Sequence, residues 1–336
     1  MDVKSYRKIL VLGMLAALAA GLGMAQQVRR YTGPWGDIND SSPMVVTEGS
    51  PLDRIPGVPV NEDTIRTARE IAVHSSQPPN WTNAPGFEKD VFTFVRGIYR
   101  YGRYGVNPRI SGSASPWGWI TDYPDSDLNL SYHLRQMTAL HVDPDGRVLK
   151  LTSPELCDYP FIYMVEPGRM ELRDEEVPIL RRYLQNGGVL MVDDFWGQKQ
   201  WDNMEHEIRR AIPEGQFEEL PMEHPLFHCV FDIKVPKNEL QTPNSQWGKW
   251  SLRRGTPNFG ITWETYHDDY TPTGARDMHV RALKDGHGRI MVIATHNCDN
   301  GDGWEREGED DEFFHTFSER RAFPLGINII FYLMTH

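Results

Sequence analysis

The stretch Asn186–Gly197, NGGVLMVDDFWG, decides the fold of this chain. Two glycines precede an apolar run, Val189–Val192, and two adjacent aspartates, Asp193 and Asp194, follow it. A short apolar run between turn residues is typical of an interior strand of a parallel sheet. In open α/β sheets, functional groups collect beyond the carboxyl ends of such strands. The sequence therefore predicts a buried strand that ends in a candidate functional site.

Strand-like and helix-like segments alternate on both sides of this stretch. This alternation predicts a three-layer α/β/α fold of the α/β class, with a mostly parallel central sheet. The expected strands are residues 91–99, 147–151, 160–166, 189–194, 228–233, 259–264, 277–283 and 289–295. The expected helices are residues 61–75, 125–140, 173–188, 199–212 and 313–334, and Pro324 is expected to kink or split the last of them.

The first 25 residues have the features of a secretory signal peptide. Lys4, Arg7 and Lys8 precede the apolar run Ile9–Leu22, and small residues follow up to Ala25. This order of charged, apolar and small residues predicts cleavage after Ala25 and export to the periplasm or the extracellular space. An uncleaved membrane anchor is the alternative, although an apolar run of about 14 residues is short for a membrane span.

The rest of the chain divides into an arm and one main domain. Residues 26–89 form the expected N-terminal arm, which is rich in Pro, Gly, Ser and Asp in its first part and carries one short helix. Residues 90–336 form the α/β domain. The formal net charge is −12 and no run of five Lys or Arg occurs, so the sequence predicts no nucleic-acid partner and no membrane contact beyond an uncleaved signal segment.

Seven stretches within residues 91–336 carry a family resemblance: FTFVRGIYRYG, WITDYPDSDLNL, LTSPELCDYPFIYMVEPG, LRRYLQNGGVLMVDDFWG, LPMEHPLFHCVFDI, HNCDNGDGWE and LGINIIFYLMTH. With these stretches in this order, the chain resembles a bacterial family of domains of unknown function, DUF4159, grouped with the class I glutamine amidotransferase-like fold. The resemblance implies a flavodoxin-like parallel sheet. It implies no activity, because the family has none established.

Glutamine amidotransferases use a cysteine nucleophile on a sharp turn between strand and helix, beside a histidine and a carboxylate. This chain has neither a G-x-C-x-G nor a G-x-S-x-G motif. Cys157 precedes an expected strand, Cys229 lies within one, and Cys298 follows one without glycines at the required spacing. The sequence therefore disfavours cysteine-based amide hydrolysis, for which Cys298 beside His296 is the only candidate left. Three inert, mostly buried thiols are expected.

Carboxylates and imidazoles at the expected strand ends are the main candidates for chemistry. They could act as an acid–base pair or hold a divalent metal, and no other cofactor is predicted. The catalytic candidates are Asp193, Asp194, His224, His228 and His296. Ligand-binding candidates at the same edge are Trp196, Asn297, Asp299 and Asp302.

Each of these candidates also has a structural interpretation. Asp193 and Asp194 could cap the helix that follows them. The two histidines of HPLFH, residues 224–228, could be satisfied partners in a half-buried turn. The stretch DNGDG, residues 299–303, has the oxygen-rich composition of a calcium loop but lacks its D-x-D-x-D-G order, and a tight Asx turn explains it equally well. The acidic stretch Trp304–Glu312 is interpreted as a solvated loop.

A second candidate surface follows the first expected strand, where tyrosines alternate with arginines and two tryptophans follow. Such a loop could line a groove for a sugar, a peptide or a partner protein, or it could pack onto its own domain. Its ligand-binding candidates are Tyr101, Arg103, Tyr104 and Asp122. Asp122 lies where a helix is expected to begin, with Asp125 or Asp127 as its cap.

The sequence favours an exported module that binds a small molecule, a glycan or an envelope protein. A hydrolase is one alternative, with Asp193 or Asp194 as base and a histidine or a bound metal as electrophile. This hydrolase requires Asp194 to converge with His224 or His228, and with His296 or Asp299. A scaffold component of the cell envelope is the other alternative.

Overall fold

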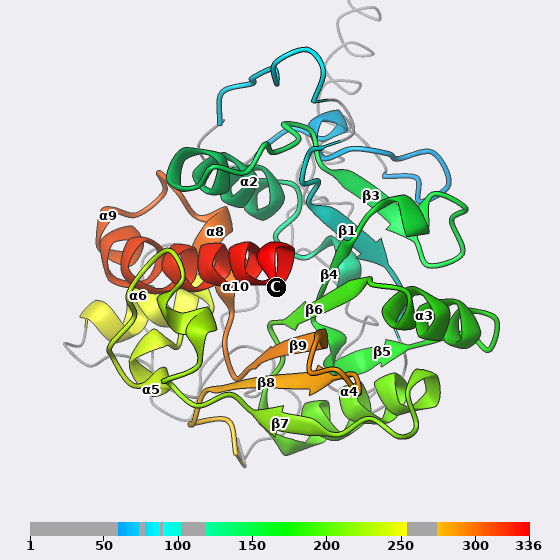
Figure 1. Ribbon diagram of the computed structural model, residues 1–336. Helices are drawn as coiled ribbons and strands as arrows, with labels where there is room; N and C mark the ends of the chain where they lie inside the picture. Colours follow the sequence, from blue (N-terminus) through cyan, green and yellow to red (C-terminus); the bar gives the residue numbers. More distant parts are fainter. Residues whose placement is uncertain (1–59, 74–77, 88–89, 102–117, 254–273) are drawn as a thin grey trace, which may run out of the picture. The chain divides into compact units, whose positions relative to one another are not determined.

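The computed structural model of the protein describes residues 60–73, 78–87, 90–101, 118–253 and 274–336. Seven strands of this part form one sheet in the order β3-β1-β4-β6-β9-β8-β7, which Figure 1 shows. The strands are β1 (Val95–Ile98), β3 (Arg147–Lys150), β4 (Phe161–Val165), β6 (Val189–Asp193), β7 (Phe217–Glu219), β8 (His279–Lys284) and β9 (Ile290–His296). A separate antiparallel pair consists of β2 (Arg100–Tyr101) and β5 (Met170–Glu171).

The strands β3, β1, β4, β6 and β9 are parallel to one another. Strand β8 is antiparallel to β9, and β7 is antiparallel to β8. Strand β6 lies at the centre, where Met191 pairs with Tyr163 of β4 and with Ile293 of β9. Every residue of β4, β6 and β9 is buried, as expected for strands covered on both faces. The predicted mostly parallel α/β sheet is therefore confirmed.

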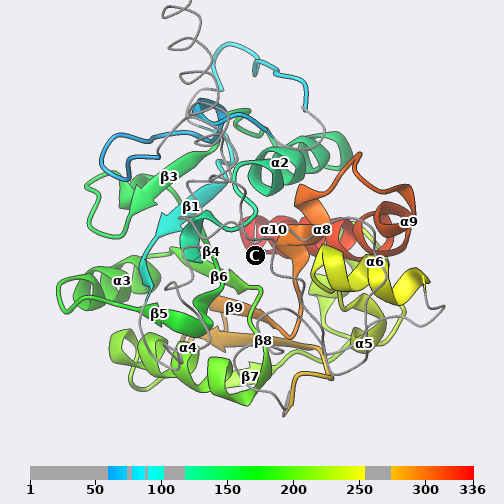
Figure 2. The same cartoon turned by 180° about the vertical axis from the view of Figure 1, so that it is seen from behind.

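Helices cover both faces of the sheet, as the two opposite views in Figures 1 and 2 show. On one face, apolar side chains of α3 (Glu176–Gln185) and α4 (Gly197–Ala211) pack against residues of β4, β6 and β9 in one core cluster. On the other face, α2 (Asp125–Met137), α8 (Asn300–Glu305) and α10 (Phe323–Thr335) contribute to the second cluster. Two further short helices are α5 (Lys237–Leu240) and α6 (Ser245–Arg253).

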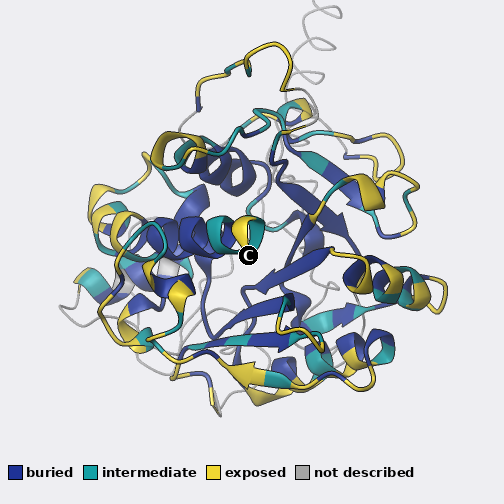
Figure 3. Ribbon diagram, viewed as in Figure 1, coloured by how far each residue is buried: buried dark blue, intermediate teal, exposed yellow. Residues whose placement is uncertain are grey.

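The surface helices and the interior helix α8 differ in burial (Figure 3). In α4 the buried residues Trp201, Met204, Ile208 and Ala211 recur at helical spacing, which gives one apolar stripe. All six residues of α8 are buried, although two of them are Asp302 and Glu305. Charged groups in such a position require partners or a ligand.

The C-terminal segment contains three consecutive helical parts. They are α9 (Asp311–Phe313), the π-helix η7 (Phe314–Ala322) and α10. The helix type changes beside Pro324, since the π-helical part ends at Ala322 and α-helical geometry begins at Phe323; the backbone stays helical across this junction, so the expected split is not found. No described helix combines the length and the apolar composition that crossing a bilayer requires.

Two expected elements are wrong. Of the expected helix at residues 61–75, the described part, 61–73, contains only the 3₁₀ turn η2 (Ala68–Glu70). The backbone there bonds outward: the Arg66 carbonyl accepts from the Val148 N–H, and the Ala68 N–H donates to the Asp145 carbonyl. The expected strand at 228–233 is absent from this described segment. There the side chain of Asn328 accepts from the N–H groups of Val230 and Phe231, so these groups join no ladder. The strand expected at 259–264 lies outside the described residues.

Candidate functional site

Strands β4, β6 and β9 are adjacent and parallel, so their carboxyl ends meet at one edge of the sheet. The residue directly after each strand is Glu166, Asp194 or Asn297, and these have φ angles of 50°, 57° and 61°. Left-handed backbone is strained for residues other than glycine, and such strain concentrates at functional sites. Three polar residues therefore occupy the sharp turns of this edge.

Asp193, the last residue of β6, is fully buried and surrounded by donors. Its Oδ2 accepts hydrogen bonds from the backbone N–H groups of Asn300, at 2.9 Å, and Gly301, at 3.1 Å. The side chains of Asn300, Thr295 and Tyr163 donate further bonds to the same carboxylate. Burial raises the pKa of Asp193 and these hydrogen bonds lower it, and the resulting pKa is about 6. Asp193 therefore ties β6 to the first turn of α8.

The expectation that the aspartates accept the free N–H groups of a helix names the wrong helix. Asp193 accepts from the first turn of α8, which lies 107 residues further along the chain, while Asp299 is the N-cap residue of that helix. The next helix along the chain, α4, has Trp196 at its N-cap position and receives no side-chain cap there. Likewise α2 begins after Pro124 without a side-chain cap, and Asp127 instead pairs with the buried Arg96. The expected cap by Asp125 or Asp127 is therefore wrong.

Asp194 belongs to a different arrangement, which we call the acidic cluster: Asp122, Asp194 and Asp299. Each residue offers one carboxylate oxygen, and these oxygens all lie within 4.8 Å of one another. Asp194 and Asp299 are each only 2% exposed. Asp122 is half-buried as a residue, but its Oδ2 is enclosed and receives no hydrogen bond from any residue that the structure describes. Helix α8 closes against this oxygen, since a Cβ on Gly301 would lie 2.1 Å from it.

A second set of three carboxylates shares Asp122 and adds Asp302 and Glu305 from α8. Arg306 pairs with two members of this set: its Nε lies 3.2 Å from Oδ1 of Asp302, and its Nη2 lies 2.9 Å from Oε2 of Glu305. Asp302 also accepts a hydrogen bond from the N–H of Ser245. The two sets therefore differ in charge balance, because an arginine contacts two members of the second.

The pKa shifts follow this difference. Burial raises the pKa of Asp299 well above its usual range, and the neighbouring charges of Asp194, Asp302 and Asp122 raise it further. Burial and the charges of Asp302 and Glu305 likewise raise the pKa of Asp122. Burial also acts on Asp302, but Arg306 outweighs it and the pKa of Asp302 is lowered. The acidic cluster therefore holds more negative charge than its protein surroundings stabilise.

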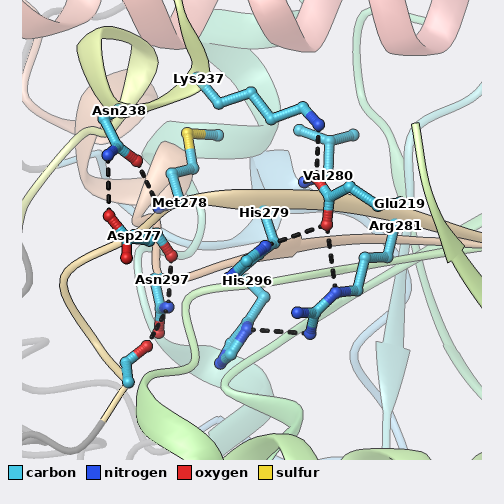
Figure 4. Close-up of polar contacts among 11 residues, drawn as sticks. Glu219, Lys237, Asn238, Asp277, Met278, His279, Val280, Arg281, His296 and Asn297 are labelled. Carbon is cyan, nitrogen blue, oxygen red and sulfur yellow. Dashed lines mark hydrogen bonds and ion pairs between the residues drawn. The ribbon is translucent and has the colours of Figure 1, made fainter. Parts of the chain in front are cut away.

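His296, the last residue of β9, is 2% exposed and has both ring nitrogens engaged, and Figure 4 shows its contact with Arg281. Nε2 lies 3.0 Å from the carbonyl oxygen of Gly197, and Nδ1 lies 3.4 Å from Nη1 of Arg281. A carbonyl only accepts and a guanidinium only donates, so the ring is neutral with its proton on Nε2. Burial lowers the pKa of His296 to about 3. These contacts hold the ring in place and leave it no free nitrogen.

Beside His296, a partly exposed ion network surrounds Glu219 of β7 (Figure 4). Glu219 accepts from Nδ1 of His279 at 2.9 Å and from Nε of Arg281 at 3.2 Å, and it also pairs with Lys237. Burial opposes the charged form, but His279 and Lys237 outweigh it and lower the pKa of Glu219 to about 2. The positive side chains of Lys237 and Arg281 therefore pair with Glu219.

Asn297 fastens the same edge to its neighbouring loops. Its side-chain oxygen accepts from the N–H of Gly197 at 2.8 Å. Its amide nitrogen donates to the carbonyl oxygens of Gly274 and Asp277, each at 2.7 Å (Figure 4). Trp196 is fully buried, and its indole N–H donates to Oδ1 of Asp194 at 3.0 Å. Asn297 therefore holds the loops beside the site, and Trp196 holds the Asp194 carboxylate.

The structure does not bring His224 and His228 to the acidic cluster. His224 packs on Tyr332, which shares a shallow pocket of about 220 Å³ with Pro160 and Val189 at the amino ends of β4 and β6. His228 bonds to Asp232 and to the carbonyl oxygen of Met222. The expected convergence of these histidines with Asp194 is not found, and their interpretation as satisfied turn residues is confirmed.

Arg103 and Tyr104 of the second candidate surface lie outside the described residues. Tyr101 is described by its backbone, which pairs with Met170 in the β2–β5 ribbon. The neighbouring Tyr99 is buried, and its hydroxyl lies 2.6 Å from the carbonyl oxygen of Val165. At least this tyrosine packs onto its own domain.

The sequence analysis missed three residues of this region. Glu166 follows β4 as Asp194 follows β6, so the strand-end argument could have found it. Glu305 and Arg306 lie in the stretch expected to be a solvated loop, but Trp304 is fully buried and Glu305 is 5% exposed. No sequence signal distinguishes these two from the exposed acids that follow them.

The three cysteines form no disulfide with one another. Cys298 is buried, and burial raises the pKa of its thiol well above the usual value. Cys229 is half-buried, with a pKa that burial also raises. Cys157 is exposed, so the expectation of mostly buried thiols is wrong for this residue, which lies in a surface 3₁₀ turn.

Residues 113–334 match the family model described as Domain of unknown function (DUF4159). The chain belongs to this family. The match includes all three residues of the acidic cluster. It also includes every strand that lies in the sequence between β3 and β9, these two included. No curated protein matches the chain.

Proposed function

We propose that this DUF4159 chain is an exported binding module that holds a positively charged ligand in the acidic cluster. The charge balance of the cluster supports this function, since three carboxylates are gathered within 4.8 Å and are nearly enclosed. The nearby arginines pair with other acids: Arg96 with Asp127, and Arg306 with Asp302 and Glu305. A cationic ligand would supply the charge that the cluster lacks.

A binding role agrees with the absence of an activated cysteine at the described strand ends. The sharp-turn positions after β4, β6 and β9 carry Glu166, Asp194 and Asn297, none of which is a thiol. Cys298 lies one residue beyond Asn297, but its buried thiol has a raised pKa and is therefore not a thiolate near neutral pH.

Hydrolysis with Asp193 as general base receives little support from the geometry. A base needs a free oxygen within reach of its proton, and the Asp193 carboxylate is already filled by five hydrogen bonds. His296 has both nitrogens engaged. Metal-assisted hydrolysis at the acidic cluster and an envelope scaffold stay separate predictions.

Thermal melting of metal-stripped protein tests the proposed function. The probes are calcium chloride, ethylamine and spermidine, each added alone at matched ionic strength. We expect at least one probe to raise the melting temperature of the wild type and to leave Asp299→Asn unchanged. Asparagine caps helices as well as aspartate does, so this variant retains the N-cap of α8.

Asp232→Asn provides the matched control, because Asp232 is exposed and pairs only at the surface with Lys234 and His228. It should respond to the probes as the wild type does. If no probe shifts the melting temperature, or if Asp299→Asn shifts as much as the wild type, the proposed function is wrong.

A further inference from the structure

The acidic cluster is built for an ion without an organic substituent. Asp194 and Asp299 are 2% exposed, and Oδ2 of Asp122 is in contact with the backbone of α8 at Gly301. An alkylammonium group brings a carbon chain that needs space beside the charge. A bare cation needs only the volume between the oxygens.

The orphaned oxygen of Asp122 points independently to an occupant. This Oδ2 is enclosed, its side chain belongs to both carboxylate sets, and no described residue donates a hydrogen bond to it. Buried polar atoms in native proteins almost always have a partner, and the exceptions frequently mark an ion or water site. Asp122 also has a φ of 60°, so a strained backbone holds the carboxylate at this position.

The oxygens lie close enough together for all three to contact one metal ion. Ligand oxygens lie about 2.4 Å from Ca²⁺, so two of them on opposite sides of the ion are about 4.8 Å apart. The three cluster oxygens lie within 4.8 Å of one another. Three carboxylates form an oxygen-only, strongly anionic ligand set, which suits a hard cation and is a poor match for zinc, whose usual ligands are nitrogen and sulfur.

On this basis, and resting on the proposed function, we propose that Asp122, Asp194 and Asp299 form a Ca²⁺ site. Ca²⁺ accepts irregular oxygen sets and gives up its water readily. Mg²⁺ demands near-octahedral geometry at about 2.0–2.1 Å and usually keeps several waters, for which an enclosed site has little room. The second carboxylate set takes no ion, because the guanidinium of Arg306 already contacts Asp302 and Glu305.

Melting and calorimetric titration of EDTA-dialysed protein test this site. A Ca²⁺ concentration of 100 times Kd should raise the melting temperature by at least about 5 °C, and titration should give one ion per chain. Mg²⁺ should give a smaller shift at equal concentration. Asp122→Asn and Asp299→Asn should each abolish the Ca²⁺ response, since asparagine tolerates left-handed backbone and keeps the side-chain shape.

Glu305→Gln is the discriminating control, because Glu305 is a buried acid of the neighbouring set with its own arginine partner. It should keep the full Ca²⁺ response. If Glu305→Gln loses the Ca²⁺ response and Asp122→Asn keeps it, the ion binds beside Glu305 and the proposed Ca²⁺ site is wrong. If ethylamine or spermidine stabilises the wild type through Asp299 while Ca²⁺ does not, the Ca²⁺ site is wrong and the proposed function stands. If neither metal nor amine binds, both are wrong.

Discussion

Two groups of acids and bases at the same sheet edge reach opposite electrostatic states. The inner pair, Asp193 and His296, ends strands β6 and β9, and both side chains are filled by hydrogen bonds from the protein. The acidic cluster includes the next residue, Asp194, and brings three carboxylates together; Oδ2 of Asp122 receives no hydrogen bond from any described residue. Asp194 and Asp299 are as deeply buried as the inner pair.

The comparison shows that burial alone does not identify a functional residue. Burial shifts the pKa of Asp193, His296, Asp122 and Asp299 alike, in each case against the charged form. What separates the groups is the supply of donors: five hydrogen bonds reach the Asp193 carboxylate, whereas Oδ2 of Asp122 receives none from the described residues. A satisfied buried group stabilises the fold, whereas an unsatisfied one calls for a ligand.

Asp193→Ala should give the largest effect. Removal of the carboxylate leaves the N–H groups of Asn300 and Gly301 without their acceptor in a buried position. Stability should fall by about 3 kcal/mol or more, measured as the free energy of unfolding in urea. A loss below about 0.5 kcal/mol would show that the hydrogen bonds of Asp193 do not stabilise the fold, and the contrast with the acidic cluster would be wrong.

The pH dependence of His296 tests the other half of the inner pair. Its folded pKa, about 3, lies below the usual histidine pKa of 6.5, so between these values the unfolded chain binds more protons and folding weakens as the pH falls. The stability advantage of wild type over His296→Gln should shrink by about 1.4 kcal/mol for each pH unit below 6.5. Asp193 titrates in the opposite sense but is common to both proteins. An advantage that grows on acidification would contradict the neutral ring.

Gly301→Ala should disturb the acidic cluster but not the hydrogen bond to Asp193. Its new Cβ would lie 2.1 Å from Oδ2 of Asp122, while the N–H of residue 301 can still reach Asp193. Overpacking should cost about 1–3 kcal/mol in chemical denaturation. The Ca²⁺-dependent melting shift should also disappear, since Asp122 must move. Retention of the full shift would show that Asp122 does not hold the ion.

Asp122→Asn should give the smallest effect, with the opposite sign. In EDTA the variant should be more stable than the wild type by about 1 kcal/mol, because a buried charge with like-charged neighbours is removed. Denaturation curves of the two proteins in EDTA measure this difference. A destabilised variant would show that the Asp122 carboxylate is satisfied, like Asp193.

Sequence patterns predicted the sheet well and the single elements unevenly. Apolar runs such as 160–166 and 189–194 are encoded locally, so β4 and β6 were found close to their observed bounds. Segments 61–75 and 228–233 were wrong because contacts from distant parts of the chain, such as Asn328, take their backbone hydrogen bonds. Local periodicity carries no information about these partners.

The sequence by itself determined the α/β class and the edge of the sheet where polar groups gather, since strand periodicity and chain order need no knowledge of distant contacts. Only the tertiary structure decided that Asp193 accepts hydrogen bonds from α8 and that Asp194 belongs to the acidic cluster. Asp193 meets donors 107 residues away, and Asp194 meets Asp122 and Asp299 from two other segments. Charge balance in a buried site depends on all groups within a few ångströms, and folding alone brings those groups together.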